Sequence, residues 1–190
     1  MNKPLLIKYF MPFIHWYALM ILIAIGIDFI LHQFDLVYIG RYLGLGGTIV
    51  ILLSFVYSLR KRKIIETGSP KQLLMWHEYL AWAGSIMLLV HAGIHFNAWL
   101  PWLAVVMLLI TVGSGLVGKF LLKNANESLK ERRIALMNTG SSIEDADKKL
   151  FFDSITVDLM KKWRIVHLPI TLLLGILTLL HIITIIMFSK

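Results

Sequence analysis

The chain has 190 residues, of which 58% are hydrophobic and only 16% are charged, and its mean hydropathy is +0.76. About a quarter of the residues in a soluble domain are charged, so this composition argues against a soluble globular protein. The sequence contains no cysteine, which excludes disulfides, thiolate zinc sites, cysteine-ligated iron–sulfur clusters and covalently attached c-type haem. Histidine, present seven times, is left as the residue type for metal or redox chemistry.

Five apolar runs are each long enough for the about 20 residues of helix that cross a bilayer. They cover residues 10–32, 38–59, 73–96, 99–122 and 164–188. The first run is too long for the apolar core of a signal peptide, and no small-residue cleavage site follows it. The sequence therefore predicts an all-α integral membrane bundle of five transmembrane helices, formed as a single membrane domain over residues 1–190.

Lysine and arginine are concentrated in the amino-terminal segment, in the 60–71 connection and in the 123–162 connection. Basic residues gather on the cytoplasmic side of membrane proteins. We therefore expect a multi-pass protein of a prokaryotic plasma (inner) membrane, with its amino terminus and the 123–162 connection in the cytoplasm and its carboxyl terminus outside. These basic segments account for the net charge of +8, so the charge does not require a nucleic-acid partner. Membrane lipids are the expected partner instead.

The long 123–162 connection carries charges of both signs and has apolar residues at helical spacing. Ser141 with Glu144 three residues later is typical of a capping box, which predicts that a second helix of this connection begins there. Its apolar stripe consists of Leu150, Phe151, Ile155 and Leu159. This stripe can lie on the membrane surface, on a partner subunit or on the protein's own spans, and the sequence leaves these alternatives open.

Two pairs of histidines with equal spacing lie in the third and fifth spans. The interval from His77 to His91 equals the interval from His167 to His181. This shared interval makes just under four helical turns and about 21 Å of axial rise, so each pair lies near one face of its helix. Because one span lies between them, the third and fifth spans run in the same direction. This geometry predicts two haem b groups with bis-histidine ligation, one held by His77 and His167 and the other by His91 and His181.

Other residues of these spans suit the same cofactors. Gly84 and Gly175 each fall midway between two histidines, where a small residue lets a porphyrin edge approach the helix, although ordinary helix packing is the alternative. We expect Arg164 to meet the propionates of the cytoplasmic-side haem and Arg41 those of the outer haem, unless each simply extends to the interface. Pro169 requires the fifth span to begin near it or to kink there.

The third span resembles the haem-carrying membrane domain of ferric reductases and NADPH oxidases. The residues that match are His77, the Ala81-Trp82 pair, His91, His95 and Asn97. The resemblance implies that His77 and His91 are axial ligands, that His95 is a distal residue near the outer haem, and that His167 and His181 are the ligands from the fifth span. The chain departs from that family in having five spans rather than six and in ending without flavin- or nicotinamide-binding domains.

The residues and the resemblance together predict a dihaem b-type cytochrome, the electron-transfer subunit of an oxidoreductase. Its expected partner is a redox protein, which would be a flavoprotein, an iron–sulfur protein or a multihaem cytochrome. A quinone can replace this protein or act together with it. The resemblance implies electrons arriving on the cytoplasmic side and leaving outside to ferric iron, oxygen or a redox protein. Two alternatives stay open: a quinone-linked cytochrome b anchor of a dehydrogenase or reductase, and a histidine-lined pathway for metal ions or protons without haem.

Several other motifs predict packing rather than chemistry. The glycine-containing run at 113–118 matches the G-x-G-x-x-G dinucleotide fingerprint, but it ends an apolar run and follows no strand. Gly40 and the glycine-rich stretch at 44–47 are likewise typical of close helix packing. His15 can line a quinone site, touch a haem or be structural, and we expect His32, near the outer interface, to be solvated.

Overall fold

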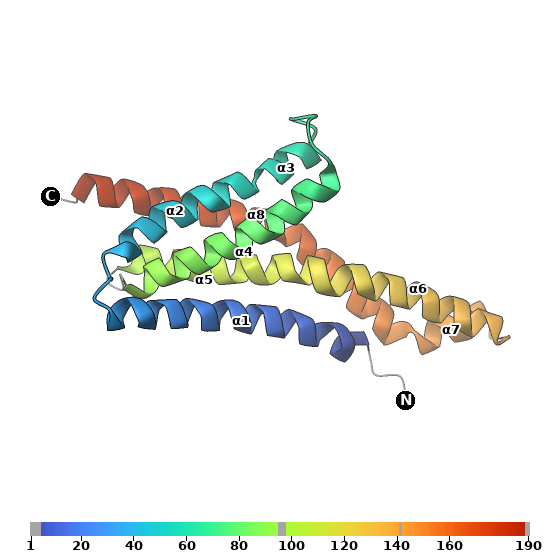
Figure 1. The fold of residues 1–190 in the computed structure, drawn as a ribbon. Coiled ribbons are helices and arrows are strands. Elements are labelled where there is room, and N and C mark those ends of the chain that lie inside the picture. Colours follow the sequence, from blue (N-terminus) through green and yellow to red (C-terminus); the bar gives the residue numbers. More distant parts are fainter. Residues whose placement is uncertain (1–4, 95–97, 141, 189–190) are drawn as a thin grey trace. The chain divides into compact units, whose positions relative to one another are not determined.

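The computed structural model describes residues 5–94, 98–140 and 142–188, and every regular element within these ranges is helical. The elements, shown in Figure 1, are α1 (Leu5–Gln33), α2 (Ile39–Ser54), α3 (Val56–Lys61), α4 (Pro70–Ile94), α5 (Trp99–Leu116), the π-helix η1 (Val117–Leu122), α6 (Lys123–Asn138), α7 (Ile143–Lys149) and α8 (Phe151–Phe188). The predicted all-α fold class is confirmed.

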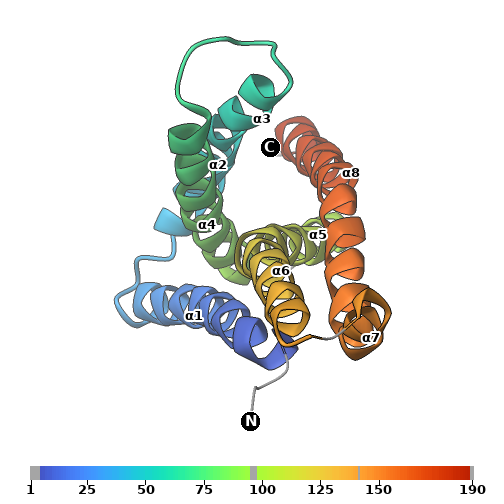
Figure 2. The same cartoon turned by 90° about the vertical axis from the view of Figure 1, so that its right-hand side faces the viewer.

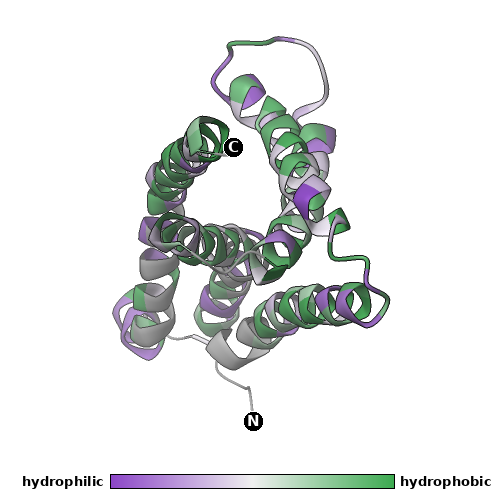
Figure 3. Cartoon of the chain, turned by 90° about the vertical axis from the view of Figure 1, so that its left-hand side faces the viewer, coloured by the Kyte–Doolittle hydropathy of each residue, from purple (hydrophilic) through white to green (hydrophobic). Residues whose placement is uncertain are grey.

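Five helical segments among the described residues are long and apolar enough to cross a membrane. They are Met11–Gln33, Ile39–Lys61, Pro70–Ile94, Trp99–Lys119 and Ile165–Phe188, and each agrees with its predicted span to within three residues. Large apolar side chains on them are exposed, as at Leu22 (65%), Phe29 (67%) and Ile186 (72%). Hydrophobic residues predominate along these helices in Figure 3. An apolar exposed surface of this extent suits a lipid environment, so the described helices are compatible with a multi-pass membrane protein.

The chain divides into two compact units. Unit 1 comprises Met1–Tyr17 and Gly113–Ile170, and unit 2 comprises Ala18–Val112 and Thr171–Lys190. The helices α1, α5 and α8 each contribute residues to both units. The single membrane domain expected over residues 1–190 stays a prediction.

In unit 2, the most extensive helix–helix contact joins α2 and α4, which lie side by side in Figures 1 and 2. The contact is centred on two buried glycines, Gly47 and Gly84. A Cβ atom added to either glycine would lie 3.1 Å from the carbonyl oxygen of the other. Small residues let helix backbones approach this closely, and they do so here at the middle of both helices.

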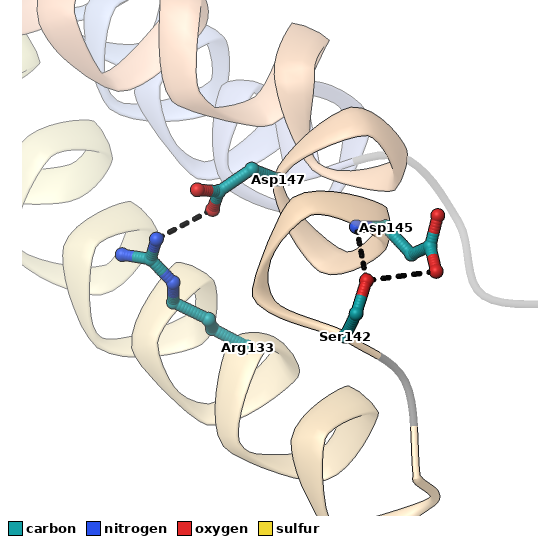
Figure 4. Close-up of polar contacts among 4 residues, drawn as sticks. All are labelled: Arg133, Ser142, Asp145 and Asp147. Carbon is teal, nitrogen blue, oxygen red and sulfur yellow. Dashed lines mark hydrogen bonds and ion pairs between the residues drawn. The ribbon is translucent and has the colours of Figure 1, made fainter.

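In unit 1, the long connection folds into α6, α7 and the first turns of α8. Arg133 of α6 forms an ion pair with Asp147 of α7, as Figure 4 shows. The Ser142 hydroxyl accepts a hydrogen bond from the backbone N–H of Asp145 at 3.1 Å and donates one to its carboxylate at 2.8 Å. Ser142 therefore caps α7, which begins at Ile143, whereas Ser141, the predicted capping serine, lies outside the described residues.

The last helix is longer than the sequence suggests. α8 begins at Phe151 and passes through Pro169 without ending, so of the two predicted alternatives for this proline the helix does not begin there, and the kink stays a prediction. A proline is tolerated inside a membrane helix when neighbouring groups satisfy the carbonyl that it leaves without a donor.

Of the predicted apolar stripe, Leu150 is buried whereas Phe151 and Ile155 are exposed, and the side chain of Leu159 lies outside the described set.

Candidate functional site

The imidazole of His91, on α4, lies against two glycines of α2. Its Nδ1 donates a hydrogen bond to the carbonyl oxygen of Gly40, 2.8 Å away. A carbonyl oxygen can only accept, so the neutral ring carries its proton on Nδ1 and its lone pair on Nε2. A Cβ atom at Gly44 would lie 2.8 Å from three atoms of the same ring. Glycine at this position therefore leaves the space that the imidazole occupies.

The imidazole of His77, also on α4, makes the same kind of contact near the other end of α2. Its Nδ1 donates to the carbonyl oxygen of Ser54 at 3.0 Å, and its ring centroid is 5.5 Å from that of Tyr57 on α3. Ser54 is the last residue of α2, and the carbonyls at the carboxyl terminus of a helix have no N–H donor within that helix. The interruption between α2 and α3 thus provides an acceptor for His77.

The two bonds repeat at one interval along an antiparallel helix pair. The separation in sequence between Gly40 and Ser54 on α2 equals the separation between His91 and His77 on α4, the histidines from which they accept. A second partner that holds Nδ1–H and leaves Nε2 as the ligating nitrogen is the usual arrangement around metal-binding histidines. Both predicted ligands of α4 have it.

His181 of α8 faces His91 within unit 2. Their ring centroids are 6.4 Å apart, and the ring planes are inclined by 58°. Two imidazoles that bind one metal ion from opposite sides, each at a metal–nitrogen distance of about 2.0–2.1 Å, have centroids about 6 Å apart. The observed separation is compatible with two rings that share one metal ion, and the two histidines come from α4 and α8.

His167 of α8 lies in unit 1 against the end of α5. Its Nδ1 is 2.5 Å from the hydroxyl oxygen of Ser114, a residue that is 1% exposed. A Cβ atom added to Gly115 would be 3.5 Å from the Cε1 atom of the same ring. The glycine motif at 113–118, expected only to pack helices, therefore also contacts a predicted ligand.

The donor set suits haem better than a metal ion bound by protein alone. Within the described ranges, no three or more histidine, cysteine, aspartate or glutamate side chains gather at one place. Haem needs only axial ligands from the protein, because the porphyrin supplies the other nitrogens, and histidine is a common axial ligand. The pair of His91 and His181, with the ring of His91 oriented by Gly40, fits that requirement.

The remaining predicted residues are placed as follows. Gly84 packs on α2, which agrees with the helix-packing alternative, whereas a Cβ atom at Gly175 would have no described atom within 4 Å. Arg41 is exposed on α2 beside Gly40. His95 lies outside the described residues, and so does the side chain of Arg164. His15 is exposed on α1.

Four residues that orient the imidazoles were not singled out as functional from the sequence: Gly40, Gly44, Ser54 and Ser114. Three of them act through a backbone carbonyl or through the absence of a side chain, so their residue type does not reveal the role. The one available signal was the interval between Gly40 and Ser54, which equals the interval between the histidines of α4.

Comparison of the chain with models of known families, with curated proteins and with solved structures finds no match. The class that the fold defines is an all-α protein whose described residues include five helices of membrane-spanning length and composition.

Proposed function

We propose that the chain is a dihaem b-type cytochrome subunit that carries electrons across a membrane between a donor and an acceptor. The observation that carries the proposal is the facing pair His91 and His181, with ring centroids 6.4 Å apart and Nδ1 of His91 bonded to a backbone carbonyl. Bound haem would supply reversible one-electron exchange at its iron. The chain supplies the two axial nitrogens, fixes the tautomer of His91, and surrounds the pair with apolar helices.

A second haem, held by His77 and His167, rests on the sequence. Each of these residues precedes its counterpart in the first pair by the same interval, on spans expected to run in the same direction. Each imidazole has an Nδ1 partner inside its own unit, Ser54 for His77 and Ser114 for His167. The similarity of the third span to ferric reductases and NADPH oxidases supports the same assignment.

The first experiment is a reduced-minus-oxidised spectrum of the purified protein, with a pyridine-haemochrome count of haem per chain. We expect a b-type α band and two haems. A protein that is folded and helical but has no α band after haem supplementation would overturn the proposal and favour the histidine-lined pathway for metal ions or protons.

For the orientation, we propose that the amino terminus and the 123–162 connection face the cytoplasm of a prokaryotic inner membrane, because basic residues concentrate there. The chain has no cysteine, so single cysteines report cleanly. Lys149→Cys places a thiol at an exposed position of α7 without removing the Ser142 cap, and Phe34→Cys places one after α1. In intact cells an impermeant maleimide should label only the second variant, and the reverse pattern would invert the orientation.

A further inference from the structure

Asp28 is an acidic residue within the first membrane-length segment, and its side chain is 29% exposed. Its Oδ1 atom is buried and has no hydrogen-bond partner among the described residues. A carboxylate inside a membrane segment is costly and is usually retained for function. The ligation of haem by histidine gives this group no role.

His32 lies one turn further along α1 and completes an acid–base pair. Its Nδ1 donates to the backbone carbonyl oxygen of Asp28 at 2.9 Å and is 3.7 Å from the Oδ1 atom of the same residue. The neutral ring therefore carries its acceptor lone pair on Nε2. His32 is 52% exposed and precedes the end of α1 by one residue. The pair therefore joins a carboxylate inside the span to an imidazole at the exposed end of the helix.

The carboxylate of Asp28 lies against α4 close in depth to His91. A Cβ atom added to Gly93 would be 3.1 Å from Oδ1, so glycine leaves the space that the carboxylate uses. Gly93 follows His91 by two residues, which is about 3 Å along the helix axis. The titratable group on the described part of α4 near this contact is His91 itself, so the carboxylate of Asp28 lies within about one helical turn of His91 along the axis of α4, and His32 lies one turn beyond it on α1.

We propose that Asp28 and His32 accept the protons of a membrane-dissolved hydroquinone that delivers its electrons to the His91 and His181 haem. This inference rests on the proposed function. The exposed apolar side chains beside Asp28 on α1, Ile25 and Phe29, open this face to the lipid phase, from which an apolar donor arrives. An aromatic diol matches the site because its O–H groups can donate to the partly exposed carboxylate of Asp28 and to Nε2 of His32.

The reaction balances within the proposed components. Both O–H bonds of the hydroquinone break, one proton passing to the partly exposed carboxylate of Asp28 and the other to Nε2 of His32. The two electrons would pass to two ferric haems, one electron to each, and the product is the quinone. The reverse sequence returns the same protons and electrons to a quinone.

A binding test uses the unaltered haem-loaded protein. Dicyclohexylcarbodiimide, an apolar reagent that couples to protonated carboxyl groups, should modify the peptide that contains Asp28, and menadione should protect it. Mass spectrometry provides the readout, and the peptide that contains the exposed Glu144 is the internal reference. Equal modification of Asp28 with and without menadione would overturn the proposal without requiring any substitution.

A kinetic test follows the α band after menadiol is mixed with the oxidised protein. Asp28→Asn should slow haem reduction by about 100-fold, the usual contribution of a proton acceptor, while haem content and reduction by dithionite stay unchanged. Asp35→Asn is the matched control, because that carboxylate is exposed and its positive φ of 54° suits asparagine. A rate equal to that of the unaltered protein in Asp28→Asn, or no reduction by menadiol of a protein that dithionite reduces, refutes the hydroquinone site. Absence of any haem band instead refutes the proposed function.

Discussion

Replacing Gly44 by alanine tests whether α2 shapes the site of His91. The new Cβ atom would lie 2.8 Å from Cγ, Nδ1 and Cε1 of the ring, closer than real Cβ contacts occur. The ring must then move away, which strains the packing and weakens its bond to Gly40. Overpacking costs about 1–3 kcal/mol and a lost hydrogen bond about 1 kcal/mol, so we expect the affinity for one haem to fall by about 30- to 700-fold.

Gly26→Ala on α1 is the matched control, because a Cβ atom there has no described atom within 4 Å. Alanine is also the better helix former, by about 1 kcal/mol, so helix propensity alone would make both variants more stable. The assay is a haem-per-chain titration, with redox-resolved α bands to show which haem is lost. If Gly44→Ala binds both haems with the affinity of the unaltered protein, the contact of α2 with His91 does not set the orientation of this ligand.

Three further substitutions probe the ligands and the space around them. His91→Ala and His181→Ala should each lower the pyridine-haemochrome count from two to one, and a count that stays at two would refute the pairing. Ser114→Ala should weaken the haem held by His167 by about 10- to 100-fold because it removes the Nδ1 partner, whereas Ser114→Thr keeps the hydroxyl and should retain it. Gly175→Ala should leave the yield of folded protein unchanged but lower haem retention if a porphyrin edge lies beside that helix, and unchanged haem affinity would exclude that contact.

The membrane spans were predictable because hydropathy is a property of composition over some twenty residues, and each bound is correct to within three residues. The beginning of α8 was not predictable by the same measure. Residues 151–163 contain charged side chains and do not extend an apolar run, although they are helical. Helix continuity through them, and through Pro169, depends on interactions that hydropathy does not report.

The histidine pattern could be recognised because equal intervals along two helices are visible in one dimension. The partners of the imidazoles could not, since they depend on the register between helices. His91 reaches the carbonyl of Gly40 only because α2 and α4 pack antiparallel with Gly47 against Gly84. Every residue except the last in a chain has a peptide carbonyl, so the sequence does not distinguish the one that accepts a hydrogen bond from a ligand.

The use of backbone acceptors on α2 has a physical consequence for a site in lipid. Water is scarce in the bilayer, so an imidazole N–H that lacks a protein partner is costly there, and a carbonyl satisfies it without burying another polar side chain. A carbonyl also cannot be removed by substituting its residue, so a substitution at Gly40 or Ser54 acts on the histidines only through helix packing, as at Gly40, where an added Cβ atom would overlap Cδ1 of Ile94 on α4. His167 differs because its partner is the Ser114 hydroxyl, a side chain that one substitution deletes. The orientation of His77 and His91 should therefore change with substitutions that move α2. The orientation of His167 should change when the hydroxyl of Ser114 on α5 is removed.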